Sequence, residues 1–207
     1  MELDEKDLGN KYNNLLTQVN VEEFLEHRDE IFNLDITLEG ELLPKAKVTD
    51  LMGYTPRFFG FHYLVSQKVV DCLKEENVSK EKYRLLKVEI KGVDEDYYLL
   101  YVPWINKSAI IFSESLIYRT FDADSSDKEY FEIKNLNDYI ELQDKEPFNS
   151  FDKVVLNSRY IKKHIISIQG ITELFFSDAI VDKLLSNSIT SLEIKNKTLL
   201  HFSEKDI

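Results

Sequence analysis

Apolar residues along this chain alternate with polar ones in many short runs, and they follow helical spacing in a few others. The alternating runs predict strands at 36–43, 58–65, 83–91, 96–104, 130–133, 154–156, 164–168, 171–176, 192–194 and 199–202. Helical spacing predicts a helix within 10–33, another at 67–76, and a third after Ser177. We therefore expect an α+β fold with a mostly antiparallel sheet, short helices, two related strand–helix–strand units and an N-terminal helical segment.

The clearest feature is a helix-opening motif that occurs twice, at Ser66 and at Ser177, with an offset of 111 residues. The identical pairs are Ser66/Ser177, Val70/Val181, Asp71/Asp182 and Leu73/Leu184. In each copy an apolar strand leads to a serine and then to a short amphipathic helix. Serine is a preferred N-cap, because its hydroxyl accepts a hydrogen bond from an amide in the first turn. We expect Ser66 and Ser177 to act as structural N-caps.

Glu-Ile-Lys follows each copy, as Glu89-Ile90-Lys91 and Glu193-Ile194-Lys195. The pattern predicts an N-terminal acidic segment at 1–57 and an α+β domain at 58–207, with repeat units near 58–104 and 171–202, or one domain overall. The segments 44–56 and 121–128 are expected to be irregular, and 92–95 is expected to be a hairpin loop.

The net charge of −12 is concentrated in two parts of the chain. Residues 1–50 hold 5 basic and 13 acidic side chains, and residues 121–152 hold 3 and 10. Such blocks repel nucleic acid and attract a basic protein. Taken alone, this charge favours solubility over a functional face. The candidate partner-binding residues are Glu22, Glu23, Glu26, Asp29, Glu30, Asp122, Asp124, Asp127 and Glu129.

The acidic start lacks the basic region and the apolar core of a signal peptide, and no apolar run reaches membrane-spanning length. The single cysteine, Cys72, excludes an internal disulfide. These features predict a soluble protein of the cytoplasm that does not bind a membrane.

Candidate chemistry is sparse. Glu89 and Lys91 fit half of a metal-dependent nuclease motif, but the required upstream aspartate is missing. The acidic run that begins at Asp122 lacks the glycine and the final glutamate of an EF-hand loop. The four histidines, His27, His62, His164 and His201, show no metal-ligand spacing. We expect no catalytic residues, no metal and no cofactor. A nuclease-like enzyme using Glu89 and Lys91, a hydrolase using Cys72, and a general protein-interaction module remain the alternatives.

Three segments of the chain resemble a bacterial polymorphic-toxin immunity family, the MXAN-type immunity domain, long catalogued as a domain of unknown function. They are Leu64–Leu73, Tyr97–Asn106 and Phe175–Leu184. The chain departs from the family pattern at Asn106-Lys107-Ser108, where an acidic residue is usual, and at Thr190-Ser191-Leu192, which lacks a glycine. The resemblance implies a non-catalytic protein that binds and neutralises a cognate toxin in the cytoplasm. The acidic blocks predict that this toxin is basic.

Overall fold

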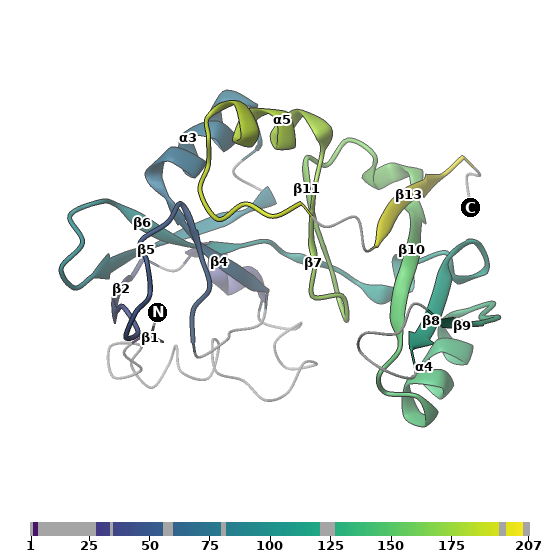
Figure 1. Ribbon diagram of the computed structural model, residues 1–207. Coiled ribbons are helices and arrows are strands. Elements are labelled where there is room, and N and C mark those ends of the chain that lie inside the picture. Colours follow the sequence, from purple (N-terminus) through teal and green to yellow (C-terminus); the bar gives the residue numbers. More distant parts are fainter. Residues whose placement is uncertain are drawn as a thin grey trace. The chain divides into compact units, whose positions relative to one another are not determined.

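The computed structural model describes residues 2–3, 28–33, 35–55, 60–79, 82–120, 127–194 and 198–204. The chain forms two compact units (Figure 1). The first comprises Met1–Pro103, His164–Ile166 and Phe176–Leu192, and the second comprises Trp104–Lys163, Ser167–Phe175 and Glu193–Ile207. Strands on both sides of residue 57 pair in one sheet of the first unit.

The first unit is built on a six-stranded sheet of order β1-β2-β5-β6-β4-β3. Its strands are β1 (Glu2–Leu3), β2 (Thr37–Glu41), β3 (Leu51–Met52), β4 (Phe61–Ser66), β5 (Arg84–Ile90) and β6 (Tyr97–Tyr101). The β2–β5 pair is parallel, and the other pairs are antiparallel. Gly92 takes φ +78 in the predicted hairpin loop between β5 and β6. This is a backbone conformation that glycine adopts without steric cost.

Helices α3 (Gln67–Glu75) and α5 (Asp178–Ser186) both belong to this unit, and they lie side by side (Figure 1). Each helix buries an apolar stripe, with Val69, Val70 and Leu73 on α3 and Ile180 and Leu184 on α5. The interior strand β6 is buried on both faces for most of its length, as expected for a central strand. Burial of these side chains is the main stabilising term for the unit.

The second unit contains a four-stranded sheet of order β13-β10-β8-β9. Its strands are β8 (Leu116–Thr120), β9 (Lys128–Phe131), β10 (Ser150–Asn157) and β13 (Leu199–Ser203). A three-stranded sheet has the order β12-β11-β7, with β7 (Trp104–Ile105), β11 (Ile165–Ile168) and β12 (Leu174–Phe176). Short 3-10 helices are η2 (Arg28–Asn33), η4 (Lys107–Ala109), η5 (Phe112–Glu114) and η6 (Ser158–Tyr160).

One helix, α4 (Leu136–Lys145), covers one face of the four-stranded sheet. Its Tyr139 ring lies 5.0 Å from the ring of Phe112 in η5 and 5.4 Å from that of Phe151 on β10. Asn135 caps the helix by accepting hydrogen bonds from the N–H groups of Asn137 and Asp138. On the opposite face Leu116, Tyr130 and Leu199 are exposed, whereas Val155 of β10 is buried.

The α+β fold class is confirmed. The strand predicted at 192–194 is wrong, because these residues are irregular, and Lys195 of the second Glu-Ile-Lys lies outside the described residues. The sequence analysis missed α4 and β8. The predicted helix at 10–33 lies outside the described residues except for 28–33, which form η2. None of the described helices is long and apolar enough to cross a membrane.

Candidate functional site

Ser66 and Ser177 each stand immediately before a nine-residue helix, with almost identical backbone angles of φ −69, ψ 163 and φ −67, ψ 155. Neither hydroxyl accepts a hydrogen bond from the first turn of its helix. Both serines therefore occupy the N-cap position as predicted, but the side-chain hydrogen bond expected there is absent. The reason is that each hydroxyl has a partner on a different strand or strand end.

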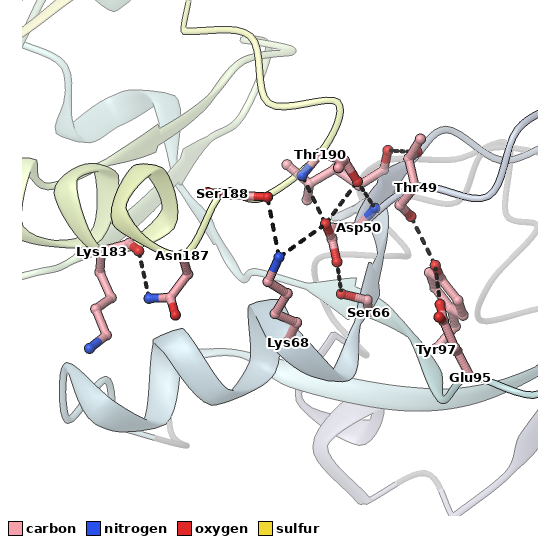
Figure 2. Close-up of polar contacts among 11 residues, drawn as sticks. Thr49, Asp50, Ser66, Lys68, Glu95, Tyr97, Lys183, Asn187, Ser188 and Thr190 are labelled. Atoms are coloured by element: carbon pink, nitrogen blue, oxygen red, sulfur yellow. Dashed lines mark hydrogen bonds and ion pairs between the residues drawn. The ribbon is translucent and has the colours of Figure 1, made fainter.

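Ser66 binds Asp50, the residue before β3, through both its main chain and its side chain. Its N–H donates to the Asp50 carbonyl oxygen at 2.9 Å, and its hydroxyl donates to Oδ1 at 2.7 Å. The N–H and the hydroxyl of Thr190 both donate to Oδ2 at 2.8 Å, and Lys68 Nζ lies 3.9 Å from the same oxygen (Figure 2). Asp50 thus joins β3, the start of α3 and the segment after α5.

The charge of Asp50 is stabilised by this arrangement. Burial acts to raise the pKa of the carboxyl group. Hydrogen bonds from the Thr190 N–H, the Ser66 hydroxyl and the Thr190 hydroxyl, together with the charge of Lys68, outweigh that effect and lower the pKa below 3.8. Asp50 is therefore an ionised structural hub at neutral pH.

Ser177 repeats this arrangement with a histidine. Its N–H donates to the carbonyl oxygen of His164 at 2.9 Å, and its hydroxyl shares a hydrogen bond with His164 Nδ1 at 3.0 Å. A serine next to a histidine is also the beginning of a nucleophilic site. Here the equivalent serine, Ser66, makes the same pair of contacts with an aspartate. The correspondence indicates that both serines fasten a strand end to a helix start.

The two helices also end in the same way, in a Schellman motif with a left-handed residue. That residue is Asn77 (φ 54) after α3 and Ser188 (φ 52) after α5. The hydrogen bonds correspond one for one at the 111-residue offset: Asn77 N–H to Lys74 and Ser188 N–H to Leu185, then Val78 N–H to Leu73 and Ile189 N–H to Leu184. The repeat seen in the sequence is therefore a repeated structural unit.

Two polar contacts connect the repeated helices to each other. Lys183 of α5 forms an ion pair with Glu75 of α3, and this hydrogen bond raises the pKa of Lys183. Lys68 Nζ of α3 donates to the carbonyl oxygen of Ser188 at 3.2 Å (Figure 2). Lys68, Glu75 and Lys183 are thus engaged within the first unit.

The residues proposed for alternative chemistry are Glu89, Lys91 and Cys72. Glu89 is exposed on β5, opposite Glu39 of the parallel strand β2, and Lys91 follows the end of β5. The described residues contain no group of three or more histidine, cysteine or carboxylate side chains arranged to hold a metal. Cys72 is buried on α3, and burial raises the pKa of its thiol, which disfavours the nucleophilic thiolate.

The histidines are dispersed. His62 is half-buried on β4 with its Nε2 atom buried, and burial lowers its pKa to about 4, so its ring is neutral at pH 7. His201 is exposed on β13, His164 holds Ser177, and His27 lies outside the described residues.

The acidic partner-binding candidates are only partly described. Glu22, Glu23, Glu26, Asp122 and Asp124 lie outside the described residues. Asp29 and Glu30 are exposed in η2 of the first unit, and Asp127 and Glu129 are exposed in the second. Glu129 Oε2 accepts a hydrogen bond from Arg119 Nε at 2.7 Å. Asp29 and Glu30 thus belong to one unit, and Asp127 and Glu129 belong to the other.

A second cluster, which the sequence analysis missed, lies on the face of the four-stranded sheet that α4 does not cover. Tyr118 and Tyr130 pair directly across β8 and β9, with ring centroids 6.1 Å apart. The Tyr130 hydroxyl donates to Asp152 Oδ2 at 2.8 Å, and Lys128 Nζ donates to Oδ1 at 2.5 Å. These hydrogen bonds lower the pKa of Asp152, and the one from Lys128 has the largest effect. Partial burial acts in the opposite direction and is outweighed. The tyrosine pair is therefore held in one geometry.

Large apolar side chains are exposed around this tyrosine pair. Tyr130 is 50% exposed, Leu116 is 44% exposed and Leu199 is 51% exposed. Phe148, in the turn between α4 and β10, is 92% exposed. The alternation of β8 signals the outward face, but the sequence does not show which face α4 covers.

No protein-family model matches this chain, and no curated protein matches it.

Proposed function

We propose that this chain is a non-catalytic immunity protein that binds a cognate bacterial toxin in the cytoplasm and neutralises it. The proposal starts from the resemblance of segments 64–73, 97–106 and 175–184 to the MXAN-type immunity domain. The observation that supports it most is that both serine motifs serve the scaffold, since Ser66 is held by Asp50 and Ser177 by His164. The motifs then identify a framework, and the function belongs to its surface.

A surface function agrees with the charge of the molecule. The exposed carboxylates of Asp29, Asp127 and Glu129 form part of the two acidic blocks. Acidic blocks accelerate the encounter with a basic protein and contribute less to the final affinity. We therefore expect the toxin domain to be basic.

The proposal expects an effector domain to be encoded beside this chain's gene, and the direct test co-expresses the two. Cells that make the effector alone should stop growing, and cells that also make this chain should grow. The two purified proteins should form a complex of defined stoichiometry in size-exclusion chromatography. Continued growth arrest together with no complex at micromolar concentrations would contradict the proposal.

The contribution of the acidic blocks has its own test. Charge reversal of Asp29 with Glu30, or of Asp127 with Glu129, should slow association with the effector, and the loss should shrink as salt is added. The matched control is reversal of Glu89 with Asp94, which are exposed and lie outside both acidic blocks. If every reversal variant associates at the wild-type rate, the acidic-block part of the proposal is wrong, and immunity itself stands.

A further inference from the structure

We propose that the outer face of the four-stranded sheet, together with Phe148, is the docking surface for a basic protein. By the outer face we mean Leu116, Tyr118, Tyr130 and Leu199. This inference rests on the proposed function, because it identifies the basic protein as the toxin domain.

Strand register places the outer-face residues side by side. Lys153 of β10 pairs with Leu116 on one side and with Leu199 on the other, so these three residues form one row across the sheet. Tyr118 and Tyr130 form the next row. Neighbouring residues of each strand point to the other side, where Ile117 and Phe151 are buried beneath α4. The outer face therefore carries an apolar row interrupted by Lys153, with the tyrosine pair beside it.

Polar contacts within this unit orient the side chains at the centre of the outer face. Asp152 accepts hydrogen bonds from both Tyr130 and Lys128, and the Lys128 ammonium lies 4.3 Å from the centre of the Tyr118 ring. Tyrosine presents a large contact area with few rotatable bonds, so little entropy is lost when it binds. Tyrosines held in this way are typical of residues that dominate binding energy.

Phe148 belongs to the same end of the sheet. It lies two residues before Ser150, which pairs with Tyr118. Its turn is fixed by the Asn149 side chain, which donates to the Glu146 carbonyl oxygen at 2.7 Å, and by the ion pair between Glu146 and Arg119 of β8. Phe148 is 92% exposed on this anchored turn. Covering its ring with an apolar pocket would remove apolar surface from water, which favours binding.

The charge around this surface selects the occupant. Residues 121–152 hold ten acidic and three basic side chains. The cations Lys128 and Arg119 are engaged by Asp152, Glu129 and Glu146. Glu132 and Glu141 pair with Lys134 and Lys145, so the three basic side chains of this segment are all engaged and its net charge stays negative. An apolar centre within a segment of excess negative charge fits a protein that presents an apolar pocket surrounded by lysine and arginine. A second copy of this chain, with the same charge of −12, would be repelled.

The experiment measures binding of the full chain to the purified effector domain encoded beside its gene, by isothermal titration calorimetry. The variants are Phe148→Ser and Tyr130→Ala. The matched control is Tyr63→Ala, which removes a tyrosine of similar exposure from β4 of the first unit. We expect Phe148→Ser and Tyr130→Ala each to raise the Kd by about tenfold or more, as for residues that dominate an interface. The control should bind like the wild type.

The outcomes separate this inference from the proposed function. If the wild type binds and both outer-face variants bind equally well, the surface is wrong and the immunity function stands. If the wild type neither binds nor protects, the proposed function fails and takes this inference with it. Phe148→Ser decides the result if Tyr130→Ala lowers the unfolding midpoint, because so exposed a side chain contributes little to folding. A dimer of this chain that Phe148→Ser dissociates would also overturn the proposal.

Discussion

The two serine–helix units have the same backbone and different polar partners. Both place a serine before a nine-residue helix and both end in a Schellman motif. Ser66 is buried and binds an aspartate that also binds Thr190 and lies beside Lys68, whereas Ser177 is half-buried and shares a hydrogen bond with His164. The strand–helix junction therefore fixes the shape of the unit, and the partner of the serine sets how strongly it is fastened.

This difference predicts unequal contributions to stability. An ionised acceptor that is hydrogen-bonded several times contributes more than a single hydrogen bond to a partly exposed ring. The network of Asp50 also spans 140 residues of sequence, from Asp50 to Thr190. Removing the Asp50 side chain should loosen the connection between the two serine–helix units. Removing the His164 side chain should affect only the unit that contains Ser177.

The largest effect is expected for Asp50→Ala. The change removes the acceptor of the Ser66 and Thr190 hydrogen bonds and leaves the buried Ser66 hydroxyl without its partner. We expect the free energy of unfolding, measured by urea titration, to fall by about 2–3 kcal/mol. Asp71→Ala is the control, since Asp71 is an exposed carboxylate on α3 and should change stability by less than about 0.5 kcal/mol. Equal losses for the two variants would show that Asp50 is not a hub.

Acid should reproduce part of that loss. The pKa of Asp50 is lower in the folded protein than its ordinary value, so its contribution is complete above about pH 4, the ordinary aspartate range, and falls as pH drops through the folded pKa. The loss should be smaller than for Asp50→Ala, because a protonated carboxyl still accepts hydrogen bonds. Urea titrations of the wild type and of Asp50→Asn between about pH 6 and pH 2 measure this loss of stability. Identical pH profiles would contradict the assignment.

His164→Ala should destabilise the protein by about 1 kcal/mol, because it removes one side-chain hydrogen bond at a half-buried site and leaves the Ser177 N–H bonded to the same carbonyl oxygen. Thermal unfolding measures the change. A loss as large as that of Asp50→Ala would remove the distinction between the two copies.

The smallest effect is expected at the left-handed residues that end the helices. Ser188→Gly should stabilise the protein by about 0.5–1 kcal/mol, because glycine adopts φ 52 without steric cost. Asn77→Gly should gain only a few tenths of a kcal/mol (about 0.3), since asparagine tolerates this conformation better than serine. A midpoint shift in urea titration provides the measurement. Stabilisation at Asn77 that exceeds that at Ser188 would contradict the comparison.

The sequence pattern predicted the helices and strands whose hydrophobic periodicity can be read within one short segment. The Val69, Val70 and Leu73 spacing predicted α3, and alternation predicted β5 and β6. Helix α4 also had a usable signal, with Asn135 as its cap and Leu136, Tyr139 and Ile140 at helical spacing. The prediction at 192–194 was wrong because three apolar-polar residues without a paired neighbour do not make a strand.

The partners of the two serines were beyond local sequence reasoning. Ser66 meets Asp50 because β3 pairs with β4, and that register follows from tertiary packing. Thr190 reaches Asp50 only after α5 packs beside α3. In the same way, β8 and α4 had to be placed before the outer face with Tyr118 and Tyr130 could be recognised.

The central claim is that the repeated serines serve the scaffold and that the function lies on the surface. It is tested most directly by growth protection with the Ser66→Ala/Ser177→Ala variant against the effector domain encoded beside the gene. The account predicts that this variant is less stable than the wild type, by about 1 kcal/mol for each serine, and still protects fully at a temperature where it is folded. A variant that folds with wild-type stability and fails to protect would contradict the account.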